Sequence, residues 1–187
     1  MISIEHILQL KGGVIMRKID FGSGIDCKPG FEGVDIKKFN NDVKHVFDLD
    51  ILPLPFENES VDEIYSSHVM EHLTNPMQTI AEFYRILKPG GKVIIKVPYF
   101  AHPGAFKPNH KIFWPMCCKD YFNGDYHEYP KWDKVDFSHV WGQSKIYWPL
   151  ERICDIIINL SDNFYEKRIS RIFPFFELII ELKKEVK

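Results

Sequence analysis

The chain has few of the features that mark disulfide-bonded, zinc-thiolate or redox proteins. Its 187 residues include four cysteines, and no two of them have the C-x-x-C spacing of a zinc or redox site. Cys117 and Cys118 are adjacent, which rarely suits a disulfide. We therefore expect free thiols, as is typical of proteins in the reducing cytoplasm.

The sequence also lacks a long apolar run, a signal peptide and an excess of charge of either sign. The late apolar stretch around residues 156–158 is too short to span a bilayer. A formal net charge of −2 argues against a nucleic-acid binder, which usually carries a basic face. These absences predict a cytoplasmic protein with no membrane span and no nucleic-acid partner, and they leave the oligomeric state open.

What is present is enough apolar material for one core. Hydrophobic residues make up 45% of the chain, and its length suits a single domain over residues 1–187. Met16 precedes the first expected strand, so residues 1–15 are either an extension before the natural start or a short packing helix.

Short apolar runs alternate with helical stretches, a pattern that predicts an α/β fold with a mostly parallel sheet. The expected strands are 15–21, 33–36, 44–49, 61–68, 92–97, one within 137–148, and 175–182. Asn75 and Pro76 are a good N-cap and first position for a helix that ends near Leu87. A second helix is expected at 149–160. Between these elements, residues 98–149 are rich in aromatics and irregular, which is typical of a lid or acceptor-binding insertion.

Two sequence features point to a nucleotide-like ligand. The run Asp20-Phe21-Gly22-Ser23-Gly24 closes the first expected strand, where glycines permit a tight turn and a close approach to a ligand. Asp35, followed by Ile36, ends the second strand, and a carboxylate there can accept from both hydroxyls of a ribose. A plain turn and a surface acid would explain the same residues.

A third feature follows the third strand, at residues 48–56. Asp48 or Asp50 could accept from an adenine amino group, with Leu49 and its apolar neighbours flanking the ring. The alternative is a proline-rich loop that covers the sheet edge.

Taken together, these motifs resemble the type-11 methyltransferase domain family of class I S-adenosylmethionine-dependent enzymes. The matching pieces are the glycine turn at 20–24, residues 33–35, 54–62, Val69-Met70-Glu71-His72-Leu73, and Arg85 through Gly91. The resemblance covers about residues 17–98. It implies a Rossmann-like three-layer α/β sandwich with an antiparallel C-terminal strand, S-adenosylmethionine as cofactor, and methyl transfer to an acceptor. A small-molecule acceptor is the preferred choice, and a sugar, a lipid precursor and a protein side chain stay open.

The resemblance also implies roles for individual residues. Gly22 and Gly24 would pass the methionine part of the cofactor, Asp35 would hold the ribose, and Asp50, or else Asp48, would lie near the adenine. The cofactor residues expected from motifs and resemblance are Asp20, Gly22, Ser23, Gly24, Asp35, Ile36, Asp48, Leu49, Asp50 and His68. Glu71-His72-Leu73 would begin the helix after the fourth strand in a structural role.

The chain departs from the family pattern in its first crossover. The family's frequent third glycine is Asp26 here, and only eight residues separate Gly24 from Gly33. That is too short for a full crossover helix, so a single turn or no helix is expected.

Four histidines, at 102, 110, 127 and 139, fall in the aromatic segment. None has a metal-ligand spacing, so we expect no metal site. His110 is the preferred general base, because imidazole titrates near neutrality and Asn109-His110-Lys111 resembles one branch of the family. A packing role for His110 stays open.

Two other functions fit parts of the sequence. A nicotinamide-dependent oxidoreductase would share the glycine turn and the ribose acid, but it would need a full G-x-G-x-x-G. A non-catalytic module that binds the cofactor or a partner protein would tolerate the short first crossover.

Overall fold

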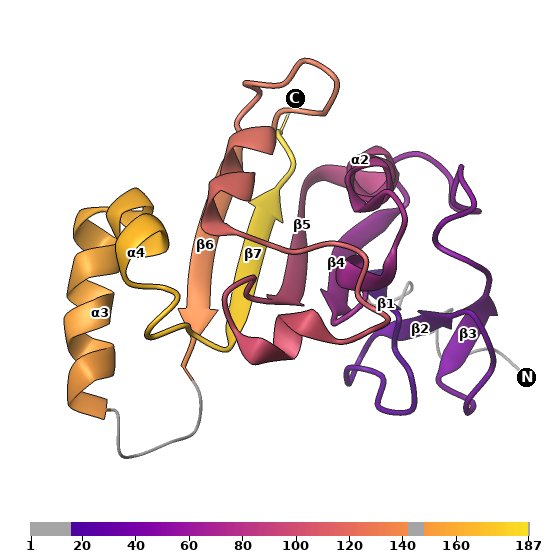
Figure 1. The fold of residues 1–187 in the computed structure, drawn as a ribbon. Coiled ribbons are helices and arrows are strands. Elements are labelled where there is room, and N and C mark those ends of the chain that lie inside the picture. Colours follow the sequence, from indigo (N-terminus) through magenta and orange to yellow (C-terminus); the bar gives the residue numbers. More distant parts are fainter. Residues whose placement is uncertain (1–15, 142–147, 187) are drawn as a thin grey trace, which may run out of the picture.

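The computed structural model describes residues 16–141 and 148–186. Their seven-stranded sheet has the order β3-β2-β1-β4-β5-β7-β6 (Figure 1). The strands are β1 (Lys18–Phe21), β2 (Glu32–Asp35), β3 (Val43–Val46), β4 (Val61–Ser67), β5 (Leu87–Pro98), β6 (Lys134–Val140) and β7 (Glu177–Lys183). The first five are mutually parallel, and β7 is antiparallel to β5 and β6. The predicted α/β fold with an antiparallel C-terminal strand is confirmed.

The strand order bears on the two cofactor classes considered above. A dinucleotide-binding sheet runs 3-2-1-4-5-6 with parallel strands. Here an antiparallel β7 lies between β5 and β6. The sheet therefore departs from the nicotinamide-binding pattern on the side away from β1 and β2.

Short turns replace helices in the first two crossovers. Residues 22–31 contain no helix, as expected, and residues 36–42 contain none either, which the sequence analysis did not anticipate. In the first turn the Asp20 carboxylate accepts from the Lys28 backbone N–H, and in the second the Asn40 side chain accepts from Asp42 and Val43. These contacts fix both loops without a helix.

The best helix begins where the sequence predicted. Helix α2 (Pro76–Ile86) starts after Asn75, whose side chain accepts from the Gln78 N–H. Phe83 of α2 stacks on Phe21 of β1 with ring centroids 4.6 Å apart, and both side chains are fully buried. The core of the domain therefore lies between α2 and the centre of the sheet.

One expectation about this region was wrong. Glu71-His72-Leu73 does not begin α2, because Met70–His72 forms a separate 3₁₀ helix, η1, and Leu73 is extended. The residue before a proline is biased away from helical backbone, so η1 cannot continue into α2. A new helix therefore begins at Pro76, with Asn75 as its N-cap. As a result, Glu71 and His72 lie on a rigid turn between β4 and α2.

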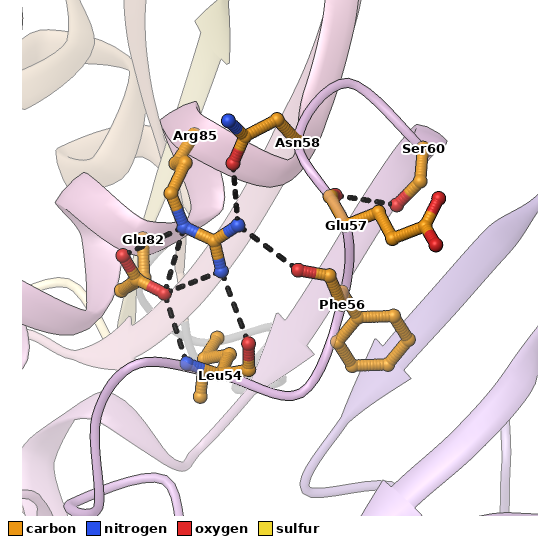
Figure 2. Close-up of polar contacts among 7 residues, drawn as sticks. All are labelled: Leu54, Phe56, Glu57, Asn58, Ser60, Glu82 and Arg85. Carbon is orange, nitrogen blue, oxygen red and sulfur yellow. Dashed lines mark hydrogen bonds and ion pairs between the residues drawn. The ribbon is translucent and has the colours of Figure 1, made fainter.

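Side chains in the last turn of α2 form hydrogen bonds to the loop at residues 54–58 (Figure 2). This loop follows the Asp48–Asp50 stretch. The Arg85 guanidinium donates to the carbonyls of Leu54 and Phe56 and to the Asn58 side chain. Glu82, one turn earlier, accepts from Arg85 and from the Leu54 N–H. One charged pair thereby satisfies several polar groups of a proline-rich loop.

The segment after β5 is irregular as expected, and its buried aromatics join the main hydrophobic core. It contains two 3₁₀ helices, η2 (Pro103–Phe106) and η3 (Met116–Tyr121), before β6. Four of its aromatic side chains are buried, namely Tyr99, Trp114, Phe122 and Trp132. Many of the clustered aromatics therefore stabilise the fold, and others such as Phe106 and Phe113 stay exposed.

Helices α3 (Trp148–Leu160) and α4 (Asp162–Arg168) pack on each other beside β6, at the opposite end of the sheet from β3 (Figure 1). Helix α3 confirms the expected helix at 149–160, and α4 was not predicted. No helix in the described part of the chain is long and apolar enough to cross a membrane. The expected extension at 1–15 lies outside the described residues.

Candidate functional site

A cavity of about 400 Å³ opens at the carboxyl ends of the parallel strands. Strand order reverses between β1 and β4, and ligands of open α/β sheets bind at such a switch point. The volume lies in the range of about 300–1,000 Å³ typical of small-molecule sites. The lining residues are Gly22, Asp35, Ile36, Phe47, Asp48, Leu49, Asp50, His68, Val69, His72, Leu73 and Lys111. Seven of the ten expected cofactor residues are among them.

The glycine turn forms one wall of this pocket. Gly22 has a φ of 76°, and its N–H and that of Ser23 both donate to the Val34 carbonyl of β2. A Cβ at Gly22 would lie 2.1 Å from Val69 Cγ2, so no larger side chain fits there unless the chain shifts. Gly22 therefore lets β1 turn under the residues that follow β4.

Asp35 is fixed at the end of β2 by the same turn. Its Oδ2 accepts from the Gly24 N–H at 2.9 Å and its Oδ1 from the Ile36 N–H at 2.7 Å. Each carboxylate oxygen can accept more than one hydrogen bond. Asp35 is thus an oriented acceptor on the pocket wall with capacity for a ligand.

The two acids after β3 differ in their surroundings. Asp50 accepts from the backbone N–H and the hydroxyl of Thr74, and Lys111 lies 3.5 Å away. Burial opposes ionisation of Asp50, but the Thr74 hydrogen bonds outweigh it and lower the pKa of the Asp50 carboxyl. The Asp48 carboxylate accepts only from the Asp50 N–H, at 2.9 Å, among the described residues. Asp48 is therefore the freer of the two toward a ligand.

His68 lies at the end of β4 with a φ of 56°, a conformation that few non-glycine residues adopt. Its Nε2 is 2.9 Å from Glu177 of β7, and its Nδ1 is 3.4 Å from Glu71. These carboxylates raise the pKa of His68 to about 9. A protonated imidazole consequently forms part of the pocket wall at neutral pH.

Three expected cofactor residues, Asp20, Ser23 and Gly24, are not among the lining residues. Asp20 is buried, which raises the pKa of its carboxyl although the Lys28 N–H donates to it. The Ser23 hydroxyl is buried and has no hydrogen-bond partner within residues 16–141 and 148–186, and a Cβ at Gly33 would lie 2.6 Å from it. These residues support the turn that carries Gly22.

The sequence analysis missed five lining residues, Phe47, Val69, His72, Leu73 and Lys111. Val69, His72 and Leu73 belong to a motif that matched the family, but His72 and Leu73 were expected to have a structural role and Val69 was given none. Lys111 follows His110, and its backbone N–H donates to the Glu71 carbonyl at 2.8 Å. The aromatic segment therefore reaches the pocket through Lys111, and the neighbouring His110 is not itself a lining residue.

The His110 ring lies behind the pocket wall against His72, with ring centroids 4.8 Å apart. Its Nδ1 is 2.9 Å from the Ala105 carbonyl. A carbonyl oxygen only accepts, so Nδ1 carries the proton and Nε2 keeps a lone pair.

The sheet and its pocket define an α/β protein with a small-molecule-sized cavity at the switch point of the sheet. Residues 23–95 match the type-11 family described as "Methyltransferase domain". This stretch therefore resembles a methyltransferase domain, in agreement with the resemblance that its motifs indicated.

Sequence relatives match only part of the chain. A sterol 4-C-methyltransferase of Caenorhabditis elegans is 31% identical over 91 residues, 45% of this chain and 27% of the relative. An uncharacterized methyltransferase of Mycobacterium tuberculosis is 40% identical over 52 residues, 28% of this chain and 20% of the relative. The chain thus matches less than a third of the length of either relative.

Among solved structures, a methyltransferase of Archaeoglobus fulgidus described as dependent on S-adenosylmethionine superposes with a TM-score of 0.63 at 19% identity. The superposition covers 97% of this chain and 93% of the other. At this identity the likeness establishes the fold alone.

Proposed function

We propose that the protein binds S-adenosylmethionine in this pocket and transfers its methyl group to a small-molecule acceptor. The observation that carries the proposal is Asp35, held by the Gly24 N–H at the end of β2 and exposed to a pocket next to Gly22. A carboxylate in this place suits the paired hydroxyls of a ribose.

The other lining residues suit the rest of the cofactor. Phe47, Ile36 and Leu49 provide apolar surface for an adenine ring. Asp48 is the better candidate to accept from the adenine amino group, because Thr74 and Lys111 already engage Asp50. This reverses the preference for Asp50 drawn from the sequence. The acids also complement a ligand that carries positive charge.

S-adenosylmethionine supplies a methyl group already activated on a positively charged sulfur. The residues of this chain therefore have to align the acceptor with that carbon and exclude water. We assign the acceptor side to His72 and Lys111, which line the pocket from η1 and from the aromatic segment. Residues 98–149 would act as the lid that sets acceptor specificity.

Where the acceptor must lose a proton, His110 can take it, since its Nε2 keeps a lone pair. A small acceptor fits the cavity of about 400 Å³ better than a macromolecule does, and the balanced charge favours it over nucleic acid. The acceptor itself is not assigned.

Calorimetry with three ligands tests the cofactor. S-adenosylmethionine and its demethylated product should bind with one site per chain and raise the melting temperature, because a ligand that binds only the native state stabilises it. NAD should do neither. Binding of NAD alone would overturn the proposal in favour of an oxidoreductase. Cofactor binding without methyl transfer to any member of an acceptor library would favour a non-catalytic module.

A further inference from the structure

The turn after β4 and the loop before Lys111 bring three ligand-type side chains together beside the pocket. One carboxylate oxygen of Glu71 and one ring nitrogen each of His72 and His110 lie within 4.8 Å of one another. The first two residues belong to η1, and the third is separated from them by α2, β5 and η2. Only the fold could reveal the cluster, which is why the spacing of the histidines predicted no metal.

Glu71 is a buried carboxylate that lacks hydrogen bonds. Its side chain is 1% exposed, and neither oxygen has a hydrogen-bond partner among the described residues. Its charged partner is His68, whose Nδ1 lies at the long distance of 3.4 Å and whose Nε2 contacts Glu177 instead. The Glu71 oxygens therefore keep unfilled acceptor positions, which buried polar groups normally fill with hydrogen bonds or a metal ion.

Both histidines have the hydrogen bonding expected of metal ligands. His72 Nδ1 is 3.0 Å from the Asn109 carbonyl, and His110 Nδ1 is 2.9 Å from the Ala105 carbonyl. Each Nδ1 must donate, so each Nε2 keeps a lone pair, and no hydrogen-bond partner of either Nε2 is found in the described ranges. Ligating histidines usually donate their other N–H to a carbonyl or carboxylate, which fixes the ring.

The backbone holds the cluster in place without help from an ion. The Glu71 carbonyl accepts from the Lys111 N–H at 2.8 Å and from the Ile112 N–H at 3.2 Å. The residue that offers the carboxylate thus also anchors the loop that offers His110. Tetrahedral zinc with bonds of about 2.0–2.1 Å needs donor atoms roughly 3.3 Å apart, so modest side-chain rotations would close the site.

We propose that Glu71, His72 and His110 bind one divalent transition-metal ion, of which Zn²⁺ is the best match. Two imidazoles and a carboxylate suit zinc, whereas Mg²⁺ and Ca²⁺ prefer oxygen ligands throughout. Three protein ligands leave a position open. His72 lines the cofactor pocket, so the open position can take an oxygen atom of the acceptor.

The role in acceptor binding rests on the proposed function, whereas the metal site itself does not. In this arrangement His110 Nε2 binds the ion and is no longer a free base. The ion would instead orient the acceptor oxygen beside the methyl donor.

The test uses the untagged full chain, stripped by a chelator and titrated with Zn²⁺ by calorimetry and with Co²⁺ by visible absorption. One ion per chain should bind, and Co²⁺ should give the absorption of a site with nitrogen ligands. Loss of an outer-shell partner typically weakens metal binding by 10–100-fold, so His110→Ala and His72→Ala should each weaken it by at least about 100-fold. His127→Ala is the matched control, because His127 is exposed and outside the cluster.

Glu71→Gln adds a second variant that keeps the shape of the buried side chain. Circular dichroism on every sample separates a lost ligand from a lost fold, and His110→Ala decides the case if Glu71→Gln does not fold. No saturable binding to the wild type, or equal affinities for His110→Ala and His127→Ala, would overturn the metal site. Titration of the same samples with S-adenosylhomocysteine tests the cofactor site separately. Metal binding without cofactor binding would count against the proposed function alone, and the reverse result would count against the metal site alone.

Discussion

Arg85 Nη2 and Glu82 Oε2 lie 2.7 Å apart on α2, and the pair joins the helix to the loop that follows the Asp48–Asp50 stretch (Figure 2). Arg85→Met would leave the Phe56 carbonyl without its donor and would remove one of the two donors to the Leu54 carbonyl, which keeps the Phe56 N–H. Hydrogen bonds to charged groups contribute about 1.5–3 kcal/mol each. Because the Arg85–Glu82 pair is partly exposed, solvent screening lowers its contribution. We therefore expect the substitution to lower the unfolding free energy by about 2–3 kcal/mol. Urea denaturation measures it, with exposed Arg171→Met as control, expected to change stability by less than about 0.5 kcal/mol.

The same pair predicts how stability depends on pH. The hydrogen bond from Arg85 lowers the pKa of the Glu82 carboxyl in the folded state. A lowered folded pKa stabilises the protein above the unfolded pKa, and this contribution is lost as pH falls through the folded value. Glu82→Gln should therefore be less stable than the wild type at pH 7, and the gap should narrow as the pH falls below about 4. A gap of constant size from pH 7 to pH 3 would contradict the assignment.

Asp35→Ala tests the assigned ribose site. Loss of two charge-assisted hydrogen bonds should cost on the order of 2–3 kcal/mol in S-adenosylhomocysteine binding, measured by calorimetry. The fold should survive, because Asp35 ends its strand at the pocket. Asp125→Ala removes the same charge from an exposed loop residue and should leave the affinity unchanged. Equal affinities for the two variants would remove Asp35 from the site.

The close approach of Gly22 and Val69 predicts a coupled pair of substitutions. Gly22→Ala should destabilise the fold by roughly 2–4 kcal/mol, because its backbone is left-handed and the new Cβ would overlap Val69 Cγ2. Val69→Ala removes that methyl group, so the double variant should lose less stability than the sum of the single changes. Thermal or chemical denaturation of all four proteins measures the coupling, and strict additivity would contradict it.

His110→Ala should separate the cofactor site from the acceptor side. His110 is not among the pocket-lining residues, so the affinity for S-adenosylhomocysteine should stay within about threefold, or ~0.7 kcal/mol. Turnover should fall by about 10²-fold or more if His110 takes the acceptor proton, the usual scale for removing a base. A histidine that only packs would lower the melting temperature and leave the rate per folded molecule intact.

Local sequence signals were enough to predict most of the parallel half of the sheet and the pocket wall. Asp35 could be placed because a strand ends there, and Gly22 because a turn must follow β1. Contacts over long sequence distances could not be predicted in this way. The ion pair between His68 and Glu177 joins β4 to β7, and the cluster of Glu71 with His110 depends on a loop folding back onto η1. No local period or spacing encodes either contact.

The helix-free turns after β1 and β2 also bear on the order in which the chain folds. Their strands pair residues close in sequence, such as Ile19 with Glu32 and Val34 with His45, whereas β5 and β7 pair Ile95 with Ile180. Short loops close at a lower entropic cost, and contacts between sequence neighbours tend to form sooner. The β1-β2-β3 edge, with Gly22 and Asp35, can therefore assemble early from the N-terminal part of the chain. The antiparallel β7, and with it the contact of Glu177 to His68, must wait until residues 177–183 have been made.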